Sequence, residues 1–570
     1  MASDFQVSGA NASAPFTLKI HRGEGMALLA MNWRRGSPPL DFVGFAIQYQ
    51  EPGGTRFFTL KNRLAFAGPA GPPSTVQLST LVSPIQSFRW VHFPFNADLP
   101  GAFIYRVTPV FMNARDELSQ GPAQEVSIEL RRETFPGLMN VCFTRGFVSS
   151  QAFVDHFANA DGITTLLPAK AEEGLSFKPT HPQSVKALAW MGFEGRSAIL
   201  ELLDQALADS SAKVLAVAYD LSEPQIVQRL EGLGPRLRII IDDEGPHGKV
   251  SSCETQAEQR LQASAGAGNV QRQHMGKLQH NKFIVVDGVA VQKVLCGSTN
   301  FSWRGLYVQA NNAVVLQGAK AVRLFTAAFE RYHTPGTVAD FSASGSALWQ
   351  PLGLKGIRAQ VAFSPHGVAN SVLGGIGLDI RSTQSSLFYS LAFLAQTPGV
   401  VKDAIADVSR SSRFVYGMAD RELGGMVLDT PDGNATPVFP AALAKNLPLP
   451  FKAEPTGGGG VRMHHKFVVI DFDKPGARVY MGSYNFSQAA DGDNGENLLL
   501  IRNRCVAVAY MVEALRLFDH YRFRNKQAAA TKARSALTLK KPPRLPGEKP
   551  WWDAHYSVPH KVRDRLLFSA

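Results

Sequence analysis

The stretch His280-Asn281-Lys282-Phe283-Ile284-Val285-Val286-Asp287 returns later in the chain as His464-His465-Lys466-Phe467-Val468-Val469-Ile470-Asp471. Both copies read H-x-K-x(4)-D, and both are followed by the signal Gly-Ser-x-Asn-Phe-Ser. The asparagine of that signal, Asn300 or Asn485, lies 20 residues after the motif histidine in one copy and 21 in the other. A duplicated pattern with matched trailing signals is far more specific than one H-x-K match, so it indicates one structural unit present twice.

Each copy predicts a β-hairpin. Four apolar, partly β-branched residues follow the H-x-K, and a turn at Asp287 and Gly288 precedes the return strand. Since side chains alternate along a strand, His280 and Lys282 are expected on one face. Asp287 is seven positions from His280 and is expected on the other face, so we interpret Asp287 and Asp471 as turn and scaffold residues.

The residue types suit the chemistry of a phosphoryl group. Histidine can attack phosphorus or donate a proton near neutral pH. Lysine and asparagine can hold non-bridging oxygens while phosphorus becomes five-coordinate. Two motif copies supply two histidines, one for each apical position of an in-line displacement.

This pattern resembles the phospholipase D superfamily, whose signature is two H-x-K-x(4)-D motifs with a trailing G-S/G-x-N, over roughly residues 136 to 525. The resemblance implies a pseudo-twofold α/β fold with both motifs in one cleft, complete in one chain. It also implies a two-step mechanism through a phosphohistidine, with no metal and no cofactor. His280 would be the nucleophile, and His464 the general acid that later activates water. The phosphate oxygens would be held by Lys282, Lys466, Asn300 and Asn485. Ser298 and Ser483 would support these residues.

One position departs from that family's pattern. Its members often carry an acidic residue about a dozen positions after the motif asparagine, and here the second copy has Glu496 while the first has Asn311. A carboxylate on one ring nitrogen fixes the tautomer of a histidine. Glu496 is therefore a further candidate, and the sequence leaves open whether it serves His280 across the cleft or His464 in its own half.

Composition narrows the class of protein. With 570 residues and 45% hydrophobic residues, the chain can form several domains with sizeable cores. The four cysteines are scattered, which argues against a metal or disulfide framework. There is no secretory signal pattern and no apolar run of the ~18 residues that a transmembrane helix needs. We therefore expect a cytoplasmic protein, with export as an effector lacking a cleavable signal as the alternative.

The positive charge is concentrated at one end. The formal net charge is +12, and residues 521–570 account for +9 of it. Such a tail could contact nucleic acid or another anionic polymer, or an anionic membrane surface, or be a solvated extension. Trp551 and Trp552 within it could touch a membrane or, as is commoner, pack back on the body of the protein.

The order of predicted elements gives a multidomain architecture. Residues 1–135 read as short strands separated by Gly/Pro-rich turns, which favours a β-sandwich loosely resembling a fibronectin type III domain. Alternating strands and helices follow in a first half, 136–345, and a second half, 346–525. The basic tail is 526–570. We expect loops over 246–268, 334–356 and 431–460.

Three functions fit these observations. The first is a nuclease, suggested by the form of the Gly-Ser-x-Asn-Phe-Ser signal, which looks like the bacterial endonuclease branch of the superfamily. The second is a phospholipase D that hydrolyses or exchanges phospholipid head groups. The third is a non-catalytic binding protein, against which two intact motifs argue. A cardiolipin-synthase-like transferase is disfavoured by the lack of predicted membrane helices.

Overall fold

The computed structural model describes most of the chain, namely residues 5–67, 78–94, 96–130, 134–146, 157, 165–334, 336–394, 397–420, 426–432, 435–438, 463–533 and 537–570. The chain forms two compact units. One consists of Met1–Arg132 with Val508–Ala570, and the other of Glu133–Ala507.

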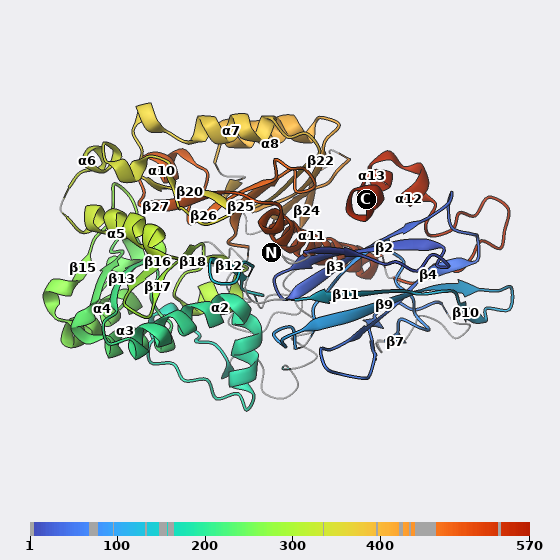
Figure 1. The fold of residues 1–570 in the computed structure, drawn as a ribbon, viewed down its shortest axis with the longest axis horizontal. Coiled ribbons are helices and arrows are strands. Elements are labelled where there is room, and N and C mark those ends of the chain that lie inside the picture. Colours follow the sequence, from blue (N-terminus) through green and yellow to red (C-terminus); the bar gives the residue numbers. More distant parts are fainter. Residues whose placement is uncertain are drawn as a thin grey trace. The chain divides into compact units, whose positions relative to one another are not determined.

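The first unit is built on two antiparallel sheets (Figure 1). One sheet has the strand order β1 (Gln6–Ser8), β2 (Phe16–Gly23), β3 (Met26–Trp33), β8 (Arg89–His92). The other has the order β10 (Leu118–Gln120), β9 (Ala102–Met112), β4 (Phe42–Gln50), β5 (Phe58–Thr59), with β11 (Gln124–Glu129) also along β9. Side chains from both sheets share one hydrophobic core, as the alternating burial along β11 illustrates. The N-terminal region is thus β-rich, as predicted, and its likeness to fibronectin type III stays a prediction.

The C-terminal segment belongs to this unit. It contains the later part of α11 (Arg504–Lys532), α12 (Ala554–Ser557) and α13 (Pro559–Ser569). The indole of Trp551 stacks on Phe88 with ring centroids 5.2 Å apart, and Trp552 is part of the sandwich core. Arg89 of β8 forms ion pairs with Asp519 and Asp564. The hypothesis that the paired tryptophans pack back is confirmed, whereas a contact of the basic residues with an anionic surface stays a prediction.

The second unit contains two sheets that repeat one another. The first has the strand order β12 (Met139–Phe143), β18 (Asn312–Gln317), β17 (Gln292–Gly297), β16 (Lys282–Asp287), β13 (Lys213–Ala218), β14 (Leu237–Ile241), β15 (Val270–Arg272). The second has the order β19 (Gln350–Pro351), β20 (Arg358–Ser364), β27 (Glu496–Arg502), β26 (Arg478–Gly482), β25 (Lys466–Ile470), β21 (Ser386–Leu391), β22 (Phe414–Asp420), β23 (Met426–Asp429), β24 (Ala435–Val438).

The correspondence extends to strand direction. In the first sheet β16 is antiparallel to β17 and β13, and β13 is parallel to β14. In the second sheet β25 is antiparallel to β26 and β21, and β21 is parallel to β22. Each H-x-K motif therefore leads into a central strand of its own sheet, and the predicted duplicated α/β unit is present.

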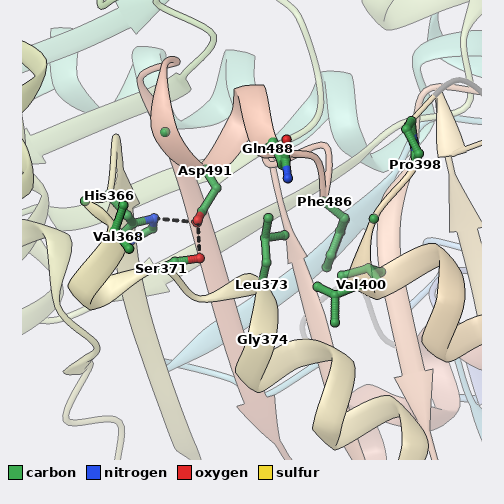
Figure 2. Close-up of a pocket in the computed structure, with 14 residues that line it drawn as sticks. His366, Val368, Ser371, Leu373, Gly374, Pro398, Val400, Phe486, Gln488 and Asp491 are labelled. Carbon is green, nitrogen blue, oxygen red and sulfur yellow. Dashed lines mark hydrogen bonds and ion pairs between the residues drawn. The ribbon is translucent and has the colours of Figure 1, made fainter.

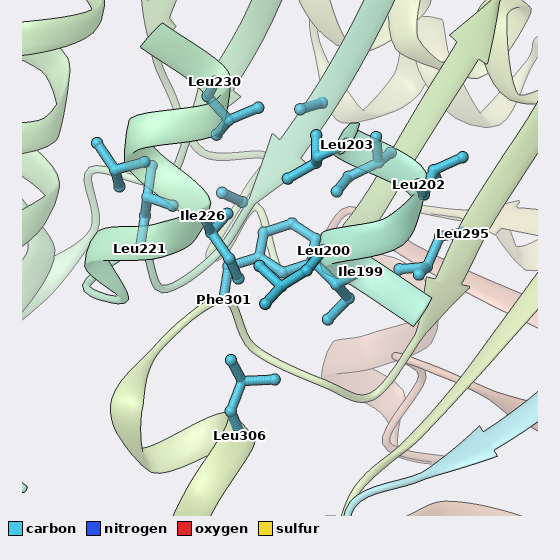
Figure 3. Packing of buried hydrophobic residues seen from close by; sticks show 14 of the residues in the cluster. Ile199, Leu200, Leu202, Leu203, Leu221, Ile226, Leu230, Leu295, Phe301 and Leu306 are labelled. Carbon is cyan, nitrogen blue, oxygen red and sulfur yellow. The ribbon is translucent and has the colours of Figure 1, made fainter. Parts of the chain in front are cut away.

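Helices cover these sheets because their apolar stripes match the apolar strand faces. The helices α2 (Ser184–Ala208) and α3 (Pro224–Gly232) bury Ile199, Leu203 and Ile226 in a core that also holds Phe301 (Figure 3). On the second sheet, α7 (Leu373–Arg381) and α8 (Val400–Ser409) play the same part. The phenyl ring of Phe325, on α5 (Ala319–His333), contacts Phe283 of the first sheet and Phe363 of the second.

Two of the expected loops contain helices. Residues 246–268 include α4 (Cys253–Ala265), which Ser252 caps by accepting a hydrogen bond from the backbone N–H of Thr255. The helix was not predicted because most of its residues are polar, although Ala257, Leu261 and Ala265 form a buried stripe along it. Residues 334–356 include α6 (Val338–Ser342), and residues 431–460 lie mostly outside the described part of the chain, although β24 falls within them. None of the described helices combines the length and apolarity that crossing a bilayer requires.

Candidate active site

The two motifs meet where the two sheets face each other. The backbone N–H of His464 donates to the carbonyl oxygen of Ala310 (2.9 Å), and that of Gly495 donates to Leu278 (2.8 Å). The first bridge joins His464 to the segment just before Asn312, and the second joins the segment just before Asn497 to the residues that precede His280. The halves are thus held together at the motifs by backbone hydrogen bonds.

The motif histidines converge as expected. The ring centroids of His280 and His464 lie 6.3 Å apart, with the ring planes at 70°. Their relative exposures are only 4% and 5%, so both rings are largely withdrawn from solvent. Two imidazoles 184 positions apart in the chain therefore face one small volume.

Each histidine takes its partner from the opposite half. Nδ1 of His280 lies 2.8 and 2.9 Å from the two carboxylate oxygens of Glu496. Nδ1 of His464 lies 2.9 Å from the side-chain oxygen of Asn311. The arrangement answers the question left open by the sequence, because Glu496 serves His280 across the interface and Asn311 fills the equivalent place for His464. In both cases an acceptor at Nδ1 leaves Nε2 as the lone-pair nitrogen.

Ser298 and Ser483 hold these partner residues. The hydroxyl of Ser298 donates to Asn311 (2.9 Å) and accepts from the backbone N–H of Asn312 (3.0 Å). The hydroxyl of Ser483 accepts from the backbone N–H of Asn497 (3.0 Å) and also bonds the Glu496 carboxylate. The serines therefore support the site through the residues that orient the histidines.

The glycine before each serine is required by close packing. Gly297 and Gly482 have φ values of 149° and 156°. A Cβ atom would lie 2.4 Å from the carbonyl oxygen of Asn312 at the first position and 2.1 Å from that of Asn497 at the second. The Gly-Ser pair thus allows a backbone approach that no other residue type permits.

The lysines and asparagines of the motifs are buried around the histidines. Nζ of Lys466 lies 3.0 Å from Nε2 of His464, and Nζ of Lys282 donates to the backbone oxygen of His280. The side-chain oxygens of Asn300 and Asn485 are buried and have no hydrogen-bond partner among the described residues. Such an amide, turned over, can offer its N–H groups to a phosphate oxygen.

Burial shapes the protonation of the site. It holds the pKa values of His280 and His464 well below the ordinary range, and the neighbouring lysine charges act in the same direction. Burial also lowers the pKa of Lys282 to about 7, against the opposing charge of Glu496. The pKa of the Glu496 carboxyl is raised to about 8 by burial, with Lys282 opposing the rise. Burial therefore disfavours the charged forms of both histidines, of Lys282 and of Glu496.

The two motif aspartates lie outside the reacting centre. Asp471 is buried and accepts hydrogen bonds from the backbone N–H groups of Gln384, Ser385 and Ser386. Asp287 is exposed at the end of β16, where it accepts a hydrogen bond from the Gln292 side chain (3.0 Å). Both positions agree with the interpretation of these residues as turn and scaffold.

A second network fixes the segment that leads into β27, whose first residue is Glu496. The carboxylate of Asp491 accepts hydrogen bonds from His366 (2.8 Å), Ser371 (2.5 Å) and Tyr484 (2.7 Å). Figure 2 shows the first two of these bonds at the edge of a pocket of about 460 Å³, lined in part by Leu373, Val400 and Phe486. Glu496 follows Asp491 by five residues, so the network restrains the approach of its carboxylate to His280.

Sequence reasoning missed two aromatic residues at the site. Tyr219 directly follows β13, and its ring lies 4.6 Å from the His280 ring and 4.5 Å from Nζ of Lys282. Phe393 follows β21, and its ring lies 6.4 Å from that of His464. Tyr219 and Phe393 come just after β13 and β21, the strands that pair with the two motif strands. Their equivalent positions in the duplicated unit could have identified them from the sequence.

A third histidine lies behind Tyr219. The ring of His247 is 4.6 Å from that of Tyr219, and its Nδ1 is 2.9 Å from the Asp242 carboxylate. Although burial opposes it, the hydrogen bond with Asp242 raises the pKa of His247. Asp242 also accepts the backbone N–H of Gln279, and so helps to fix the residue before His280. Across the described part of the chain, no three His, Cys, Asp or Glu side chains are arranged to hold a metal ion.

Comparisons with known proteins agree with this architecture. Residues 203–333 and 444–519 match the family model described as "Cardiolipin synthase, PLD-like domain". No curated protein matches the chain.

Several solved structures are similar at low identity. Polyphosphate kinase from Porphyromonas gingivalis is 10% identical (TM-score 0.35), with 64% of this chain and 51% of that chain covered. Phosphatidylserine synthase from Haemophilus influenzae Rd KW20 is 13% identical (TM-score 0.38), with 60% and 92% covered. Nuc from Salmonella typhimurium, a phospholipase D family member, is 25% identical (TM-score 0.19), with 24% and 84% covered. This chain thus spans about half the length of the polyphosphate kinase that it matches. The family-model match falls on both halves, so the chain contains a phospholipase D-like domain in two parts.

Proposed function

We propose that the protein is a phosphodiesterase that works through a phosphohistidine intermediate on His280. The observation that carries this proposal is the facing pair of imidazoles, each bound at Nδ1 by a partner from the opposite half. Reacting atoms are about 3–3.5 Å apart before attack, so one phosphorus flanked by two such contacts needs roughly 6–7 Å. The ring centroids of His280 and His464 are 6.3 Å apart, so the two imidazoles are near enough to contact one phosphate group from two sides.

In the first step, Nε2 of His280 attacks phosphorus and forms the N–P bond. The P–O bond to the leaving group breaks at the opposite apical position, and the leaving oxygen takes a proton from Nε2 of His464. In the second step, water enters where the leaving group departed and gives a proton to His464. The new P–O bond forms as the N–P bond breaks, and both histidines return to their starting state.

The unequal partners of the two histidines favour His280 as the nucleophile. A phosphorylated imidazole with hydrogen on Nδ1 carries a positive charge, and the Glu496 carboxylate at 2.8 Å stabilises that charge. Asn311 offers His464 an oxygen of a neutral amide, which fixes the tautomer without holding the proton permanently. A group that must give up and recover a proton in each cycle is better served by the neutral partner.

Lys282 and Lys466 would neutralise the bound phosphate, with the amides of Asn300 and Asn485. Binding of an anion offsets the burial that lowers the pKa values of His464 and Lys282. The substrate itself therefore promotes the protonated His464 that the first step requires.

Two substrate classes follow from different observations. The Gly-Ser-x-Asn-Phe-Ser signals, which resemble those of bacterial endonucleases, favour a nucleic acid. The description of the matched family model names a cardiolipin synthase, which favours a phospholipid. Both substrates would undergo the same displacement at phosphorus.

The test is incubation of the purified protein with single-stranded DNA, RNA and phosphatidylcholine vesicles, each with EDTA present and absent. We expect cleavage of one class, unaffected by EDTA and lost in His280→Ala and His464→Ala. Activity that EDTA abolishes and added zinc restores would contradict the phosphohistidine mechanism. Cleavage by His280→Ala at the wild-type rate would contradict the assignment of the nucleophile.

A further inference from the structure

Phe393 presents an aromatic surface beside His464. Its ring is half-buried, perpendicular to the His464 ring at 89°, and 6.0 Å from Nζ of Lys466. Its two neighbours, His464 and Lys466, are the second-motif equivalents of His280 and Lys282, which lie beside Tyr219. Unlike the Tyr219 ring, which lies 4.6 Å from His280 and 4.5 Å from Lys282, the Phe393 ring packs at longer distances from its two neighbours.

The backbone holds Phe393 in a costly conformation. Its φ is 67°, in the left-handed region that bulky residues seldom adopt. Hydrogen bonds hold the chain on both sides of it: the N–H of Ala392 donates to the carbonyl oxygen of His465 (3.0 Å), and the carbonyl oxygen of Phe393 accepts from the Thr397 hydroxyl (3.1 Å). Strain that the surroundings maintain is characteristic of functional positions.

In-line displacement places the leaving group on the side of the phosphate where Phe393 lies. If His280 attacks phosphorus, the leaving oxygen departs on the opposite side, which is the side of His464 and Phe393. The acceptor of the second step enters at the same apical position. A residue beside His464 therefore contacts both the group that leaves and the group that replaces it.

We propose that Phe393 is the specificity-determining residue for the leaving group and the acceptor, favouring those with an apolar carbon chain over water and polyols. This inference rests on the proposed phosphohistidine mechanism. The acceptor step is balanced: an alcohol R–OH gives its proton to Nε2 of His464, its oxygen bonds to phosphorus, and the N–P bond to His280 breaks. The product is a new phosphodiester in place of the hydrolysis product.

A simple probe separates this inference from the identity of the natural substrate. With bis(4-nitrophenyl) phosphate, the first step releases 4-nitrophenolate, and the phosphoenzyme then reacts with water or with added 1-butanol. The quantity to measure is the ratio of butyl 4-nitrophenyl phosphate to 4-nitrophenyl phosphate. Because both products come from one intermediate, the ratio is independent of the fraction of active enzyme.

We expect Phe393→Ala to lower this ratio about tenfold, which corresponds to roughly 50 Å² of apolar surface that the ring and a butyl chain withdraw from water together. Phe393→Leu should keep most of the wild-type ratio. The matched control is Tyr219→Phe, which changes the other aromatic residue, on the His280 side, and should leave the ratio unchanged. An unchanged ratio in Phe393→Ala overturns the inference.

A series of alcohols tests the wild-type protein without any variant. The ratio should rise about fourfold per added methylene from ethanol to hexanol, and glycerol should compete poorly. A ratio that does not depend on chain length overturns the inference even if Phe393→Ala fails to fold. Failure of the proposed function looks different, because then no 4-nitrophenolate would be released in a reaction that requires His280.

Discussion

The carboxylate of Glu496 is the group whose charge should matter most to the first chemical step. It has no solvent exposure, and both of its oxygens lie within 2.9 Å of Nδ1 of His280. In Glu496→Gln, an amide oxygen can still accept the hydrogen bond, so at a pH above 8, where Glu496 is ionised, the variant removes the charge and keeps the shape. Attack on phosphorus converts a neutral imidazole into a positively charged phosphoimidazole, which only the carboxylate stabilises electrostatically.

The magnitude follows from the effect of a charge at this distance. An opposite charge within hydrogen-bonding reach favours the charged form of an ionisable group by about 1–3 pKa units. Two units correspond to about 2.7 kcal/mol, or about a hundredfold in rate. If the amide turns its N–H₂ toward Nδ1, the ring adopts the wrong tautomer, and the loss can approach the ~10⁴-fold seen for such a change in catalytic triads. We expect a reduction of about 10²- to 10⁴-fold.

The assay is the pre-steady-state release of 4-nitrophenolate from bis(4-nitrophenyl) phosphate, which reports the first step alone. Thermal unfolding is the control. Because burial raises the pKa of Glu496 from its ordinary 4.5 to about 8, the stability linked to its proton is full below 4.5 and is lost as pH rises through 8. The neutral glutamine escapes this loss, so Glu496→Gln should gain stability relative to the wild type as pH rises. A variant that folds and releases 4-nitrophenolate within about threefold of the wild-type rate would refute the reasoning.

Three further predictions concern other parts of the site. Asn311→Asp places a carboxylate on Nδ1 of His464, where it should raise the pKa of that histidine and shift the pH dependence of turnover to higher pH; an unchanged pH profile would contradict the pairing. Binding of inorganic phosphate near pH 7 should be accompanied by proton uptake, because the anion raises the pKa of Lys282 from about 7. Calorimetry in buffers of different ionisation enthalpy measures this uptake, and its absence would contradict the prediction. Asp471→Asn should lower the free energy of unfolding by about 1–3 kcal/mol, because three backbone N–H groups lose a charged acceptor. The same change at the exposed Asp287 should alter the free energy of unfolding little. Equal effects of the two variants in denaturant titrations would contradict the scaffold role of Asp471.

The sequence was sufficient for the features that depend on local pattern. Strands β3, β4 and β14 and helix α8 coincide with apolar runs or helical periodicity that clear turn signals bound in the sequence. The duplication was also readable, since two motifs with matched spacing require matched strands. The sequence did not predict helix α4, because the few small and aliphatic residues of its buried stripe are separated by many polar residues.

The site could be predicted only as far as the motifs reach. His280 and His464 were recognisable, but the exchange of partners between halves depends on how two sheets pack, which no local pattern encodes. Tyr219 and Phe393 carry no motif of their own, and their place beside the histidines follows from strand pairing. The packing of Trp551 and Trp552 is likewise a tertiary outcome, although their apolar surface made it a reasonable hypothesis.

The central claim is that His280 carries the phosphoryl group, and one measurement addresses it directly. In His464→Ala, 4-nitrophenolate should still leave bis(4-nitrophenyl) phosphate because it needs no proton, while the second step lacks its base, so the intermediate should accumulate. Mass spectrometry of the alkali-quenched protein should then locate an acid-labile nitrophenyl phosphoryl group on His280, near one per chain. No adduct on any histidine, or an adduct that persists in His280→Ala, would contradict the account.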